Sequence, residues 1–539
     1  MATGLGRALL PLFLLAAGCA DRSSPDAAQA GEIERGGTVV VAAPQDLEAP
    51  DILVAQNRYT QEILRYALFV PLIRYGPHLE MEPALAATWT MAADTGAIFQ
   101  LRRDVHWHDG PLTTALDVKF TLDRAMDPQT AFPNASDFGE WTGSEIIDSF
   151  TIRVRWRPHS DPLAGLPFLP VMPKHLLDSV PANAMSRAAF NRNPVGNGPF
   201  RFVEHRANDR WVFQANDDFP AGLGGRPAID RLVWKVVPDP TAQLTEIQTG
   251  AVDLILNVRP ESLDGLAADA SLQTIIRNSR QYAFIGWNGR RAPFADARVR
   301  RALSLALDRQ RMIDLLRNGQ GTLAIGPIGP YHWAYADSLA PLAFDSSAAR
   351  GLLAEAGITD RNGDGRLDLP DGRPFRFELA YPAGNTYNRD LAEMIAADLA
   401  AIGVTVAPSP VEQNTLIERM TSAARDFDAT LMGWESDFRI NLRDLFHGGA
   451  LDGAFQIAHY SNRSVDSLID RTATLVDREQ ARPLFVRLQQ ILRDDEPWTF
   501  LYYYPDVYVA SAKLHGVDMD IRGAFVNLNR WWKSESAAR

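Results

Sequence analysis

Residues 99–124 read FQLRRDVHWHDGPLTTALDVKFTLDR, which is a strand, a tight turn and a helix in close succession. The turn is indicated by Asp109-Gly110, a pair that is typical of tight turns. Thr114 stands directly before the apolar periodic run, and Asp117 follows three residues later. This spacing predicts a capping box at the start of the helix, with aspartate in place of the usual glutamate.

Outward from this stretch the chain shows two kinds of pattern. Short strands with turn signals dominate up to about residue 235. After about residue 282, strands alternate with amphipathic helices: we expect strands at 375–381 and 429–432, and helices at 297–318 and 388–402. Such alternation indicates a parallel α/β sheet. The sequence therefore predicts an N-terminal mixed lobe and a later α/β lobe, with an aromatic strand at 499–509.

The stretch at 99–124 closely resembles the signature of family 5 bacterial solute-binding proteins, the peptide and nickel receptors of ATP-binding-cassette importers. Matches to this family are spread over most of the chain, which a chance motif would not produce. They include the segments Pro83–Trp89, Gly196–Phe202, Val236–Leu254, Pro293–Arg309 and Tyr460–Ile469. The resemblance implies a bilobal fold like that of periplasmic binding proteins (type II, cluster C), with two mixed α/β lobes, a hinge and an extra N-terminal subdomain.

The resemblance also implies domain boundaries and a mode of action. The expected boundaries are 37–281 and 502–539 for lobe I, about 79–203 for a subdomain inserted in it, and 282–501 for lobe II. The chain would cross between the lobes near Gln281 and Tyr502. A short peptide or similar solute would be captured between the closing lobes and delivered to the permease subunits, with no covalent bond made or broken. We expect the receptor to act as a monomer.

The N-terminal residues have the pattern of a secreted lipoprotein. Residues 1–18 combine one positive charge, a short apolar run and small residues, which describes a signal peptide. The run is too short to span a bilayer, which takes about 20 residues. LAAGC at 15–19 resembles the bacterial lipobox, in which Cys19 is lipidated; a plain signal peptide with an incidental cysteine is the alternative. Residues 19–36 predict a flexible tether, so the domain is expected outside the cytoplasm on a lipid anchor.

Charge and cysteine content exclude several classes of site. The net charge of -12 argues against a nucleic-acid partner, because phosphate binding needs a basic face. The single cysteine excludes an intramolecular disulfide and a metal site with two cysteines. No cofactor is expected.

Two predicted loops carry groups that are complementary to a peptide. Ligands of open α/β sheets bind beyond the carboxyl ends of the strands, and the strands at 375–381 and 429–432 lead towards Arg389 and towards Trp434 and Asp437, respectively. Asp437 would bind the α-ammonium, Arg389 the carboxylate through a bidentate fork, and Trp434 would form an apolar wall. These segments resemble those of dipeptide receptors that carry the same roles.

A simpler interpretation is that Arg389 is an exposed residue near a helix start and Asp437 a surface acid. After Asp437 the chain reads FRINLRD, whereas many peptide receptors continue with Asp-Pro-Asp-Asn. Arg439 and Arg443 could neutralise Asp437 or recruit an anion, which argues against strict dipeptide specificity.

Two other functions fit parts of the sequence. His106 and His108, followed by Asp109, resemble the metal pair of amidohydrolases, so a secreted metal-dependent amidohydrolase is the alternative from a different class. Such an enzyme needs further His and Asp ligands downstream, and the sequence offers none at a convincing place. A nickel or metal-chelate receptor of the same fold is the other alternative.

Residues 360–371 read DRNGDGRLDLPD and have the spacing of an EF-hand loop, with aspartate where the bidentate glutamate usually stands. The candidate calcium ligands are Asp360, Asn362, Asp364, Asp368 and Asp371. Either a structural calcium site or a plain surface turn fits this loop.

Overall fold

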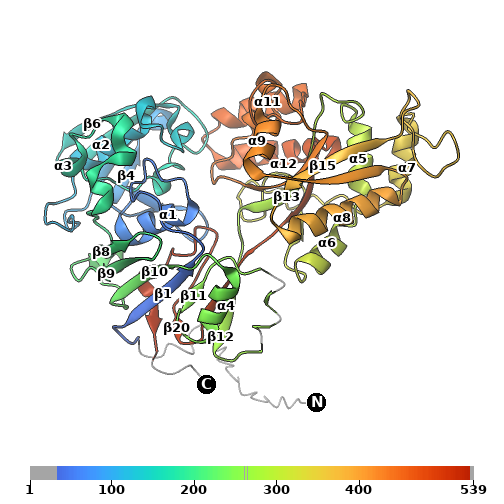
Figure 1. Ribbon diagram of the computed structural model, residues 1–539. Coiled ribbons are helices and arrows are strands. Elements are labelled where there is room, and N and C mark those ends of the chain that lie inside the picture. The colour runs from blue at the N-terminus through green and yellow to red at the C-terminus, as the bar shows by residue number, and fades with distance from the viewer. Residues whose placement is uncertain (1–32, 260–261, 264, 267, 535–539) are drawn as a thin grey trace, which may run out of the picture.

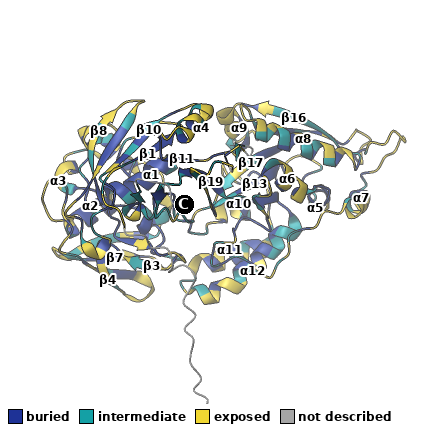
Figure 2. Cartoon of the chain, turned by 90° about the horizontal axis from the view of Figure 1, so that it is seen from below, coloured by how far each residue is buried: buried dark blue, intermediate teal, exposed yellow. Residues whose placement is uncertain are grey.

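The computed structural model describes residues 33–259, 262–263, 265–266 and 268–534. Figure 1 shows two lobes side by side, and the chain passes between them twice. Buried residues fill the centre of each lobe, whereas exposed residues cover the outer helices and loops (Figure 2). None of the described helices combines the length and the apolar character needed to cross a membrane.

Lobe I is built on a seven-stranded mixed sheet. In order across the sheet, its strands are β12 (Leu272–Arg277), β19 (Asp506–Ser511), β11 (Leu254–Ile255), β1 (Thr38–Ala43), β10 (Arg231–Val236), β9 (Arg210–Ala215) and β8 (Phe200–Arg206). Strand β1 is parallel to β10 and β11. Strand β19 comes from the C-terminal part of the chain and is antiparallel to both of its neighbours. Helix α4 (Pro240–Gln248) packs against β11 and β19.

Smaller elements complete lobe I. They are α1 (Arg58–Ile63), the π-helical turn η2 (Leu64–Leu68), the strand pair β2 (Ile73–Tyr75) and β3 (Met81–Pro83), helix α3 (Lys174–Leu177), and the C-terminal pair β20 (Leu514–His515) and β21 (Trp532–Lys533). The last residues of the described chain belong to this lobe, because Leu514, Phe525 and Trp531 lie in its hydrophobic core.

A second, antiparallel sheet lies within the N-terminal part of lobe I. Its strands are, in order, β4 (Ala86–Met91), β5 (Gly96–Leu101), β7 (Thr151–Trp156) and β6 (Trp141–Asp148). Helix α2 (Ala115–Met126) packs on β6 and β7. The predicted capping box of this helix is confirmed, with Asp117 Oδ2 accepting a hydrogen bond from the Thr114 backbone N–H at 2.9 Å.

Lobe II is built on a six-stranded sheet that helices cover on both faces. Its strands are, in order, β14 (Thr322–Leu323), β18 (Trp498–Tyr503), β13 (Gln281–Trp287), β17 (Ala429–Glu435), β15 (Arg376–Pro382) and β16 (Thr405–Val411). Its helices are α5 (Ala297–Leu305), α6 (Arg309–Leu316), α7 (Ser346–Glu355), α8 (Thr386–Ala400), α9 (Gln413–Thr421), α10 (Arg443–Phe446), α11 (Arg463–Thr474) and α12 (Arg478–Asp495). Alternate residues of β13 point to opposite faces: Ile285 lies in one hydrophobic cluster and Phe284 in the other.

Two predictions for lobe II need correction. The sheet is mixed and not parallel throughout, because only β15 is parallel to its neighbours β16 and β17, while β13 is antiparallel to β17 and β18. The single helix predicted at 297–318 is two helices, α5 and α6. The break occurs because Asp308 takes a non-helical backbone conformation and caps α6, its side chain accepting a hydrogen bond from the Arg311 backbone N–H at 3.1 Å.

The chain crosses between the lobes from β12 to β13 and from β18 to β19. The strand predicted at 499–509 is therefore two strands in two different sheets. They are separated by Tyr504 and Pro505, and proline lacks the backbone N–H that a continuous central strand would use. At the crossings the two segments are joined by a hydrogen bond of 2.6 Å from Ser279 Oγ to the Tyr504 carbonyl.

Candidate functional site at the lobe boundary

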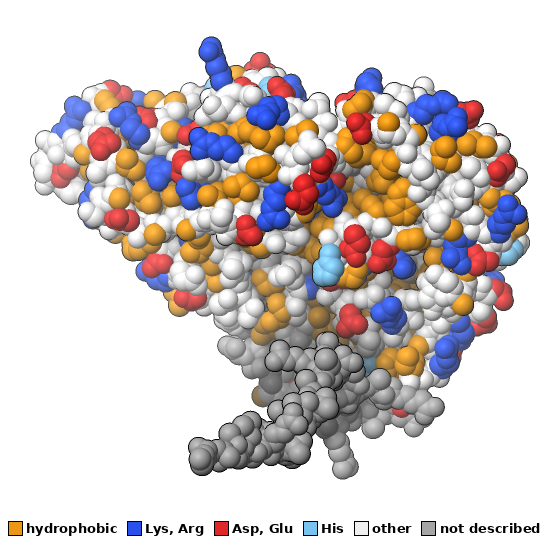
Figure 3. Space-filling model, turned by 180° about the vertical axis from the view of Figure 1, so that it is seen from behind, with side chains coloured by type: hydrophobic (Ala, Val, Ile, Leu, Met, Phe, Trp, Pro, Cys, Tyr) orange, Lys and Arg blue, Asp and Glu red, His pale blue; other side chains and the backbone are white. Residues whose placement is uncertain are grey.

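A cavity of about 320 Å³ lies between the two lobes next to the crossings. We call it the cleft cavity. Lobe I contributes residues of α1 and η2, among them Arg58, Glu62 and Arg65, and lobe II contributes Asp437 and neighbouring residues that follow β17. Figure 3 shows the notch between the lobes from behind, with acidic and basic side chains close together near the boundary. The cavity walls therefore carry charges of both signs.

The Asp437 carboxylate is available to a ligand in this cavity. Its side chain is 83% exposed, and its ion pair with Arg280 is long, at 4.0 Å between Nη1 and Oδ1. Arg280 instead pairs closely with Glu435, at 2.5 Å. Arg280 is therefore near Asp437 but does not form a close ion pair with it.

The residue after Asp437 connects the two lobes. Phe438 is almost fully buried, and its ring packs against two rings of lobe I, 5.1 Å from Phe168 and 5.2 Å from Tyr75 between centroids. The next residue, Arg439, donates a hydrogen bond of 3.3 Å from Nη1 to the Ser136 carbonyl of lobe I. The lobes therefore touch through this segment on one side of the cleft cavity.

A buried ion-pair network stabilises the lobe I side of the crossings. Asp506, the first residue of β19, accepts from Arg58 at 2.5 Å and from Arg277 at 2.6 Å. Burial alone would raise the pKa of Asp506, but the two guanidinium groups outweigh it and hold the pKa below its ordinary value. Gln281, on the other side of the crossing, donates to the same carboxylate at 3.3 Å.

A second carboxylate faces Asp437 from lobe I. Burial, together with the negative charge of Asp437, raises the pKa of Asp137 to about 6, against the opposing effect of Arg439. Two carboxylates that approach from opposite walls repel each other when both are ionised. A cation placed between them, such as an ammonium group, would relieve that repulsion.

Of the three binding residues predicted from sequence, Asp437 lies at the cleft cavity, while Arg389 and Trp434 are not among its lining residues. Arg389 is in the first turn of α8, half exposed, and pairs with Asp390 at 2.9 Å. Trp434 lies on β17 and packs on the hydrophobic cluster of lobe II, with its ring 5.8 Å from those of Trp498 and Phe455. The structure does not bring these three side chains together, so their joint role stays a prediction.

Sequence reasoning missed most of the cavity wall. Arg65 carried a detectable signal, because it is the charged residue within the apolar helical run from Ile63 to Phe69. Arg280 and Glu435 carried none, because their pairing depends on β13 and β17 lying side by side in the sheet.

Metal-binding patterns in the sequence are not matched by clustered ligands. Among the residues that the structure describes, no three His, Cys, Asp or Glu side chains are gathered as a metal site. His108 Nε2 instead bonds the Gly198 carbonyl at 3.0 Å, and Asp109 pairs with His175 at 2.9 Å. His106 is exposed. The arrangement gives no support to the amidohydrolase alternative.

The candidate calcium loop at 360–371 forms hydrogen bonds within itself. Asp360 accepts from the backbone N–H groups of Gly363 at 2.7 Å and Gly365 at 2.9 Å, and Asp368 accepts from that of Arg361 at 3.1 Å. Asp371 pairs with Arg373 at 2.7 Å. The carboxylates at EF-hand positions therefore already have donors, and calcium binding stays a prediction. The predicted signal peptide and Cys19 lie outside the described residues.

Comparisons with known proteins fit this architecture. The family model described as bacterial extracellular solute-binding proteins, family 5 Middle, matches residues 80–440. The oligopeptide-binding protein AppA of Bacillus subtilis (strain 168) is 28% identical over 532 residues, covering 97% of this chain and 97% of that protein. The heme-binding protein A of Haemophilus influenzae is 29% identical over 444 residues, covering 78% of each chain.

Solved structures show the same fold. The structure of AppA from Bacillus subtilis in complex with a nonapeptide has a TM-score of 0.77 at 28% identity, covering 94% of this chain and all 100% of that one. NikZ from Campylobacter jejuni in complex with Ni(L-His) has a TM-score of 0.76 at 23% identity and covers 92% of this chain and 99% of that one. The bilobal α/β class predicted from sequence is confirmed. With two thirds of its length matched by the family model and its whole fold shared with the solved structures, the chain belongs to the bacterial extracellular solute-binding proteins of family 5.

Proposed function

We propose that this chain is the receptor of an ATP-binding-cassette importer and captures short peptides between its two lobes. The observation that carries the proposal is the exposed Asp437 carboxylate in a cavity that both lobes line. A peptide with a free N-terminus offers the ammonium group that this carboxylate lacks. Relatives whose names specify oligopeptides or dipeptides support peptides as the solute class.

The capture mechanism follows from the two crossings. A hinge of two short segments lets the lobes rotate as rigid bodies, because few residues have to change their backbone angles. Closure excludes water from the cleft cavity and strengthens the attraction between Asp437 and an ammonium group. The closed shape is then what the permease recognises. Binding in this way breaks no covalent bond, so no catalytic residue is required.

Replacing Asp437 tests the proposal directly. We expect Asp437→Ala to weaken the binding of tri- to pentapeptides with a free N-terminus by about 2–5 kcal/mol, the cost of an unpaired ammonium in a closed site. Isothermal titration calorimetry with free and N-acetylated peptides measures this difference. Asp452→Ala is the matched control, because Asp452 is an almost fully exposed acid of lobe II. Equal affinities of wild type and Asp437→Ala for free peptides would contradict the role of Asp437.

The same calorimetric series examines the other predicted contacts. If Arg389 binds the peptide carboxylate, Arg389→Ala weakens peptides with a free C-terminus more than C-terminally amidated ones. Equal loss for both would remove Arg389 from the site. Heme and the nickel–histidine complex belong in the panel, since relatives carry those names; binding of either one, with no peptide bound, would replace the peptide proposal.

The membrane anchor and the oligomeric state belong to the same proposal. We infer that residues 1–18 are removed, that Cys19 carries the lipid, and that the receptor acts as a monomer on a short tether. Cys19→Ser should then move the protein from the membrane fraction to the soluble extracytoplasmic fraction. Light scattering of that soluble form measures its mass, and a dimer would contradict the monomer.

A further inference from the structure

Arg65 is a buried cation without a partner of opposite charge. It is 8% exposed, and its Nε atom is buried with no hydrogen-bond partner. Its guanidinium lies over the Phe168 ring, 4.3 Å from the centroid, and 5.3 Å from that of Tyr66. No ion pair joins it to any residue in the described part of the chain.

Three other buried or half-buried arginines at the cleft cavity have a carboxylate partner, whereas Arg439 donates, among the described residues, only to the backbone carbonyls of Ser136 and Asp137. Arg58 pairs with Asp506, Arg280 with Glu435, and Arg522 with Asp520, each at 2.5 Å. An arginine side chain stays charged in proteins, so burial cannot neutralise Arg65 by removing its proton. Burying a charge without a counter-charge is costly. An anionic group of a bound solute could therefore supply the partner that Arg65 lacks.

Arg65 lies where two cavities adjoin. It lines the cleft cavity and also a cavity of about 360 Å³ whose walls come from lobe I alone. We call the second one the lobe I cavity. Phe168 and Arg522 line both cavities as well. A solute that enters between the lobes and extends into lobe I passes the Arg65 guanidinium.

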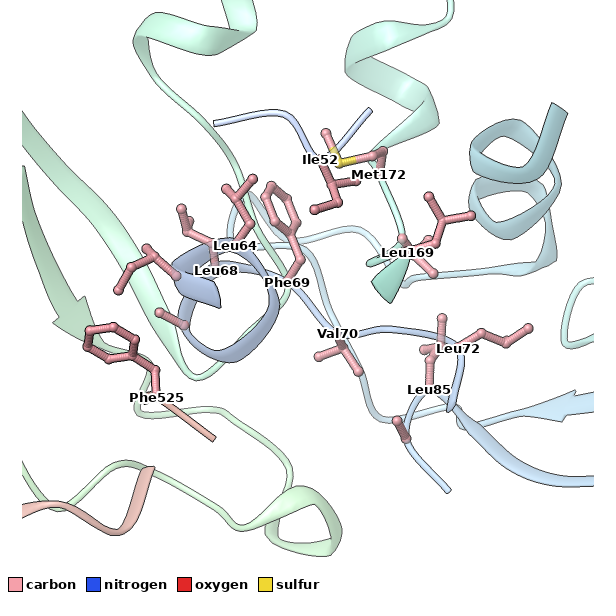
Figure 4. Close-up of a cluster of buried hydrophobic side chains, with 14 of the residues drawn as sticks. Ile52, Leu64, Leu68, Phe69, Val70, Leu72, Leu85, Leu169, Met172 and Phe525 are labelled. Atoms are coloured by element: carbon pink, nitrogen blue, oxygen red, sulfur yellow. The ribbon is translucent and has the colours of Figure 1, made fainter. Parts of the chain in front are cut away.

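The backbone around Arg65 holds the side chain in this place. Arg65 belongs to the π-helical turn η2, in which the Phe69 backbone N–H donates to the Leu64 carbonyl at 2.8 Å. Leu64, Leu68 and Phe69 pack into the hydrophobic cluster around this turn (Figure 4). Single π-helical turns inside helices are frequent at functional sites. Here the wide turn is anchored by apolar side chains on both sides of one charged residue.

We propose that Arg65 binds a carboxylate of the captured solute. The proposal rests on the proposed peptide-binding function and adds a specificity: the preferred solutes are peptides that place a carboxylate beside Arg65, with chain length to spare for the lobe I cavity. The carboxylate can be the C-terminus or the side chain of an aspartate or glutamate. Both present the two oxygens that a guanidinium binds in a bidentate manner.

The experiment measures how much affinity each carboxylate contributes with and without Arg65. The probes are alanine pentapeptides that carry one Glu or one Gln at each position in turn, each with a free or an amidated C-terminus. For wild type, we expect one carboxylate to increase affinity at least tenfold over its neutral counterpart. In Arg65→Gln this ratio should fall to within about threefold. Arg65→Lys keeps the charge but loses the bidentate guanidinium, so its ratio should lie between those of wild type and Arg65→Gln. An effect in the Glu series identifies a side-chain carboxylate as the group that Arg65 binds, and an effect of the free C-terminus identifies the C-terminal carboxylate.

Controls separate this proposal from its premise. Arg210→Gln is the matched variant, since Arg210 is an arginine of lobe I that lines neither cavity and is paired with Glu204 at 3.2 Å; its ratio should equal that of wild type. A carboxylate effect that persists unchanged in a folded Arg65→Gln overturns the proposal and leaves peptide binding intact. If wild type binds no peptide, the proposed function fails. Mass spectrometry then identifies the solute that co-purifies with wild type and with Arg65→Gln, which tests the role of Arg65 separately. An anionic solute lost from Arg65→Gln supports its role, and a solute retained by both proteins overturns it.

Discussion

The two walls of the cleft cavity are built in different ways. The lobe I wall includes residues of α1 and η2 whose charges are buried: Glu62 and Arg65 are less than a tenth exposed, and Arg58 is tied to Asp506. The lobe II wall is an irregular segment after β17, in which Asp437 is 83% exposed. Charged side chains in a buried network cannot move without breaking ion pairs. An exposed carboxylate on a loop can move without breaking any. In the proposed receptor, lobe I is therefore the preformed half of the site, and we expect lobe II to complete it on closure.

The largest effect is expected from breaking the fixed wall. Asp506→Asn removes the counter-charge of two buried arginines, which should lower the free energy of unfolding by about 3–5 kcal/mol. Urea denaturation followed by circular dichroism measures this change. Asp452→Asn is the control, because its ion pair with Arg290 is on the surface and should be worth about 0.5 kcal/mol or less. A similar loss for both variants would show that the lobe I wall is no more rigid than the surface.

The same variant has a pH signature. Because the pKa of Asp506 is lowered in the folded chain, its carboxylate stabilises the fold above the ordinary value of 3.8, and this contribution is lost as the pH falls below it. Wild type should therefore lose stability more steeply than Asp506→Asn in this acid range. Parallel curves would mean that Asp506 is not held by the two arginines.

A smaller effect is expected from the loop wall. Phe438→Ala removes the ring that packs on Phe168 and Tyr75 and should weaken peptide binding by about 10–100-fold, because buried aromatic anchors dominate such contacts. Global stability should change less than in Asp506→Asn. Phe455→Ala is the matched control, since Phe455 is a half-exposed phenylalanine of lobe II outside the cleft cavity. Calorimetry measures the peptide affinity of both variants. Equal affinities of Phe438→Ala and Phe455→Ala would show that Phe438 does not contribute to the contact between the lobes during binding.

The facing carboxylates predict a pH effect on closure of the ligand-free chain. The raised pKa of Asp137 means that its neutral form is favoured when the lobes are in contact, and that contact weakens as the pH rises through about 6. Small-angle X-ray scattering should therefore give a larger radius of gyration at about pH 7.5 than at about pH 5. Asp137→Asn should abolish the difference. A radius that is independent of pH in wild type would contradict repulsion across the cleft.

The smallest effect concerns the loop at 360–371, far from either wall in sequence. Its carboxylates already accept hydrogen bonds from the loop and from Arg373, so removing calcium has little to change. Treatment with a chelator, followed by addition of calcium, should shift the melting temperature by less than about 1 °C. A clear rise with calcium would establish the structural site that the spacing suggests.

Local features were predictable from the sequence, and pairings between distant segments were not. The capping box at Thr114 depends on residues within one turn of each other, so spacing alone reveals it. The break at Asp308 was missed because the apolar pattern continues across it. The separation of β18 from β19 was missed because aromatic residues run through both strands, although Pro505 marked the place.

The candidate site shows the same division. Asp437 was found from its position after a strand and from the resemblance to the family. Arg65 and Asp137 reach the same cavity from segments about 300 to 370 positions earlier, and no periodicity encodes that approach. The resemblance predicted two lobes with two crossings, but it could not indicate which charges remain without a partner.

The position of β19 has a consequence for how the molecule is assembled after synthesis. Lobe II occupies one continuous stretch between the crossings and can fold as soon as that stretch is available. The sheet of lobe I has a gap between β11 and β12 until residues 506–511 arrive, more than 460 positions after β1. Pairings over such separations are slow to form. The N-terminal lobe is therefore the last to be completed, although its first strand is the first part of either lobe to be synthesised.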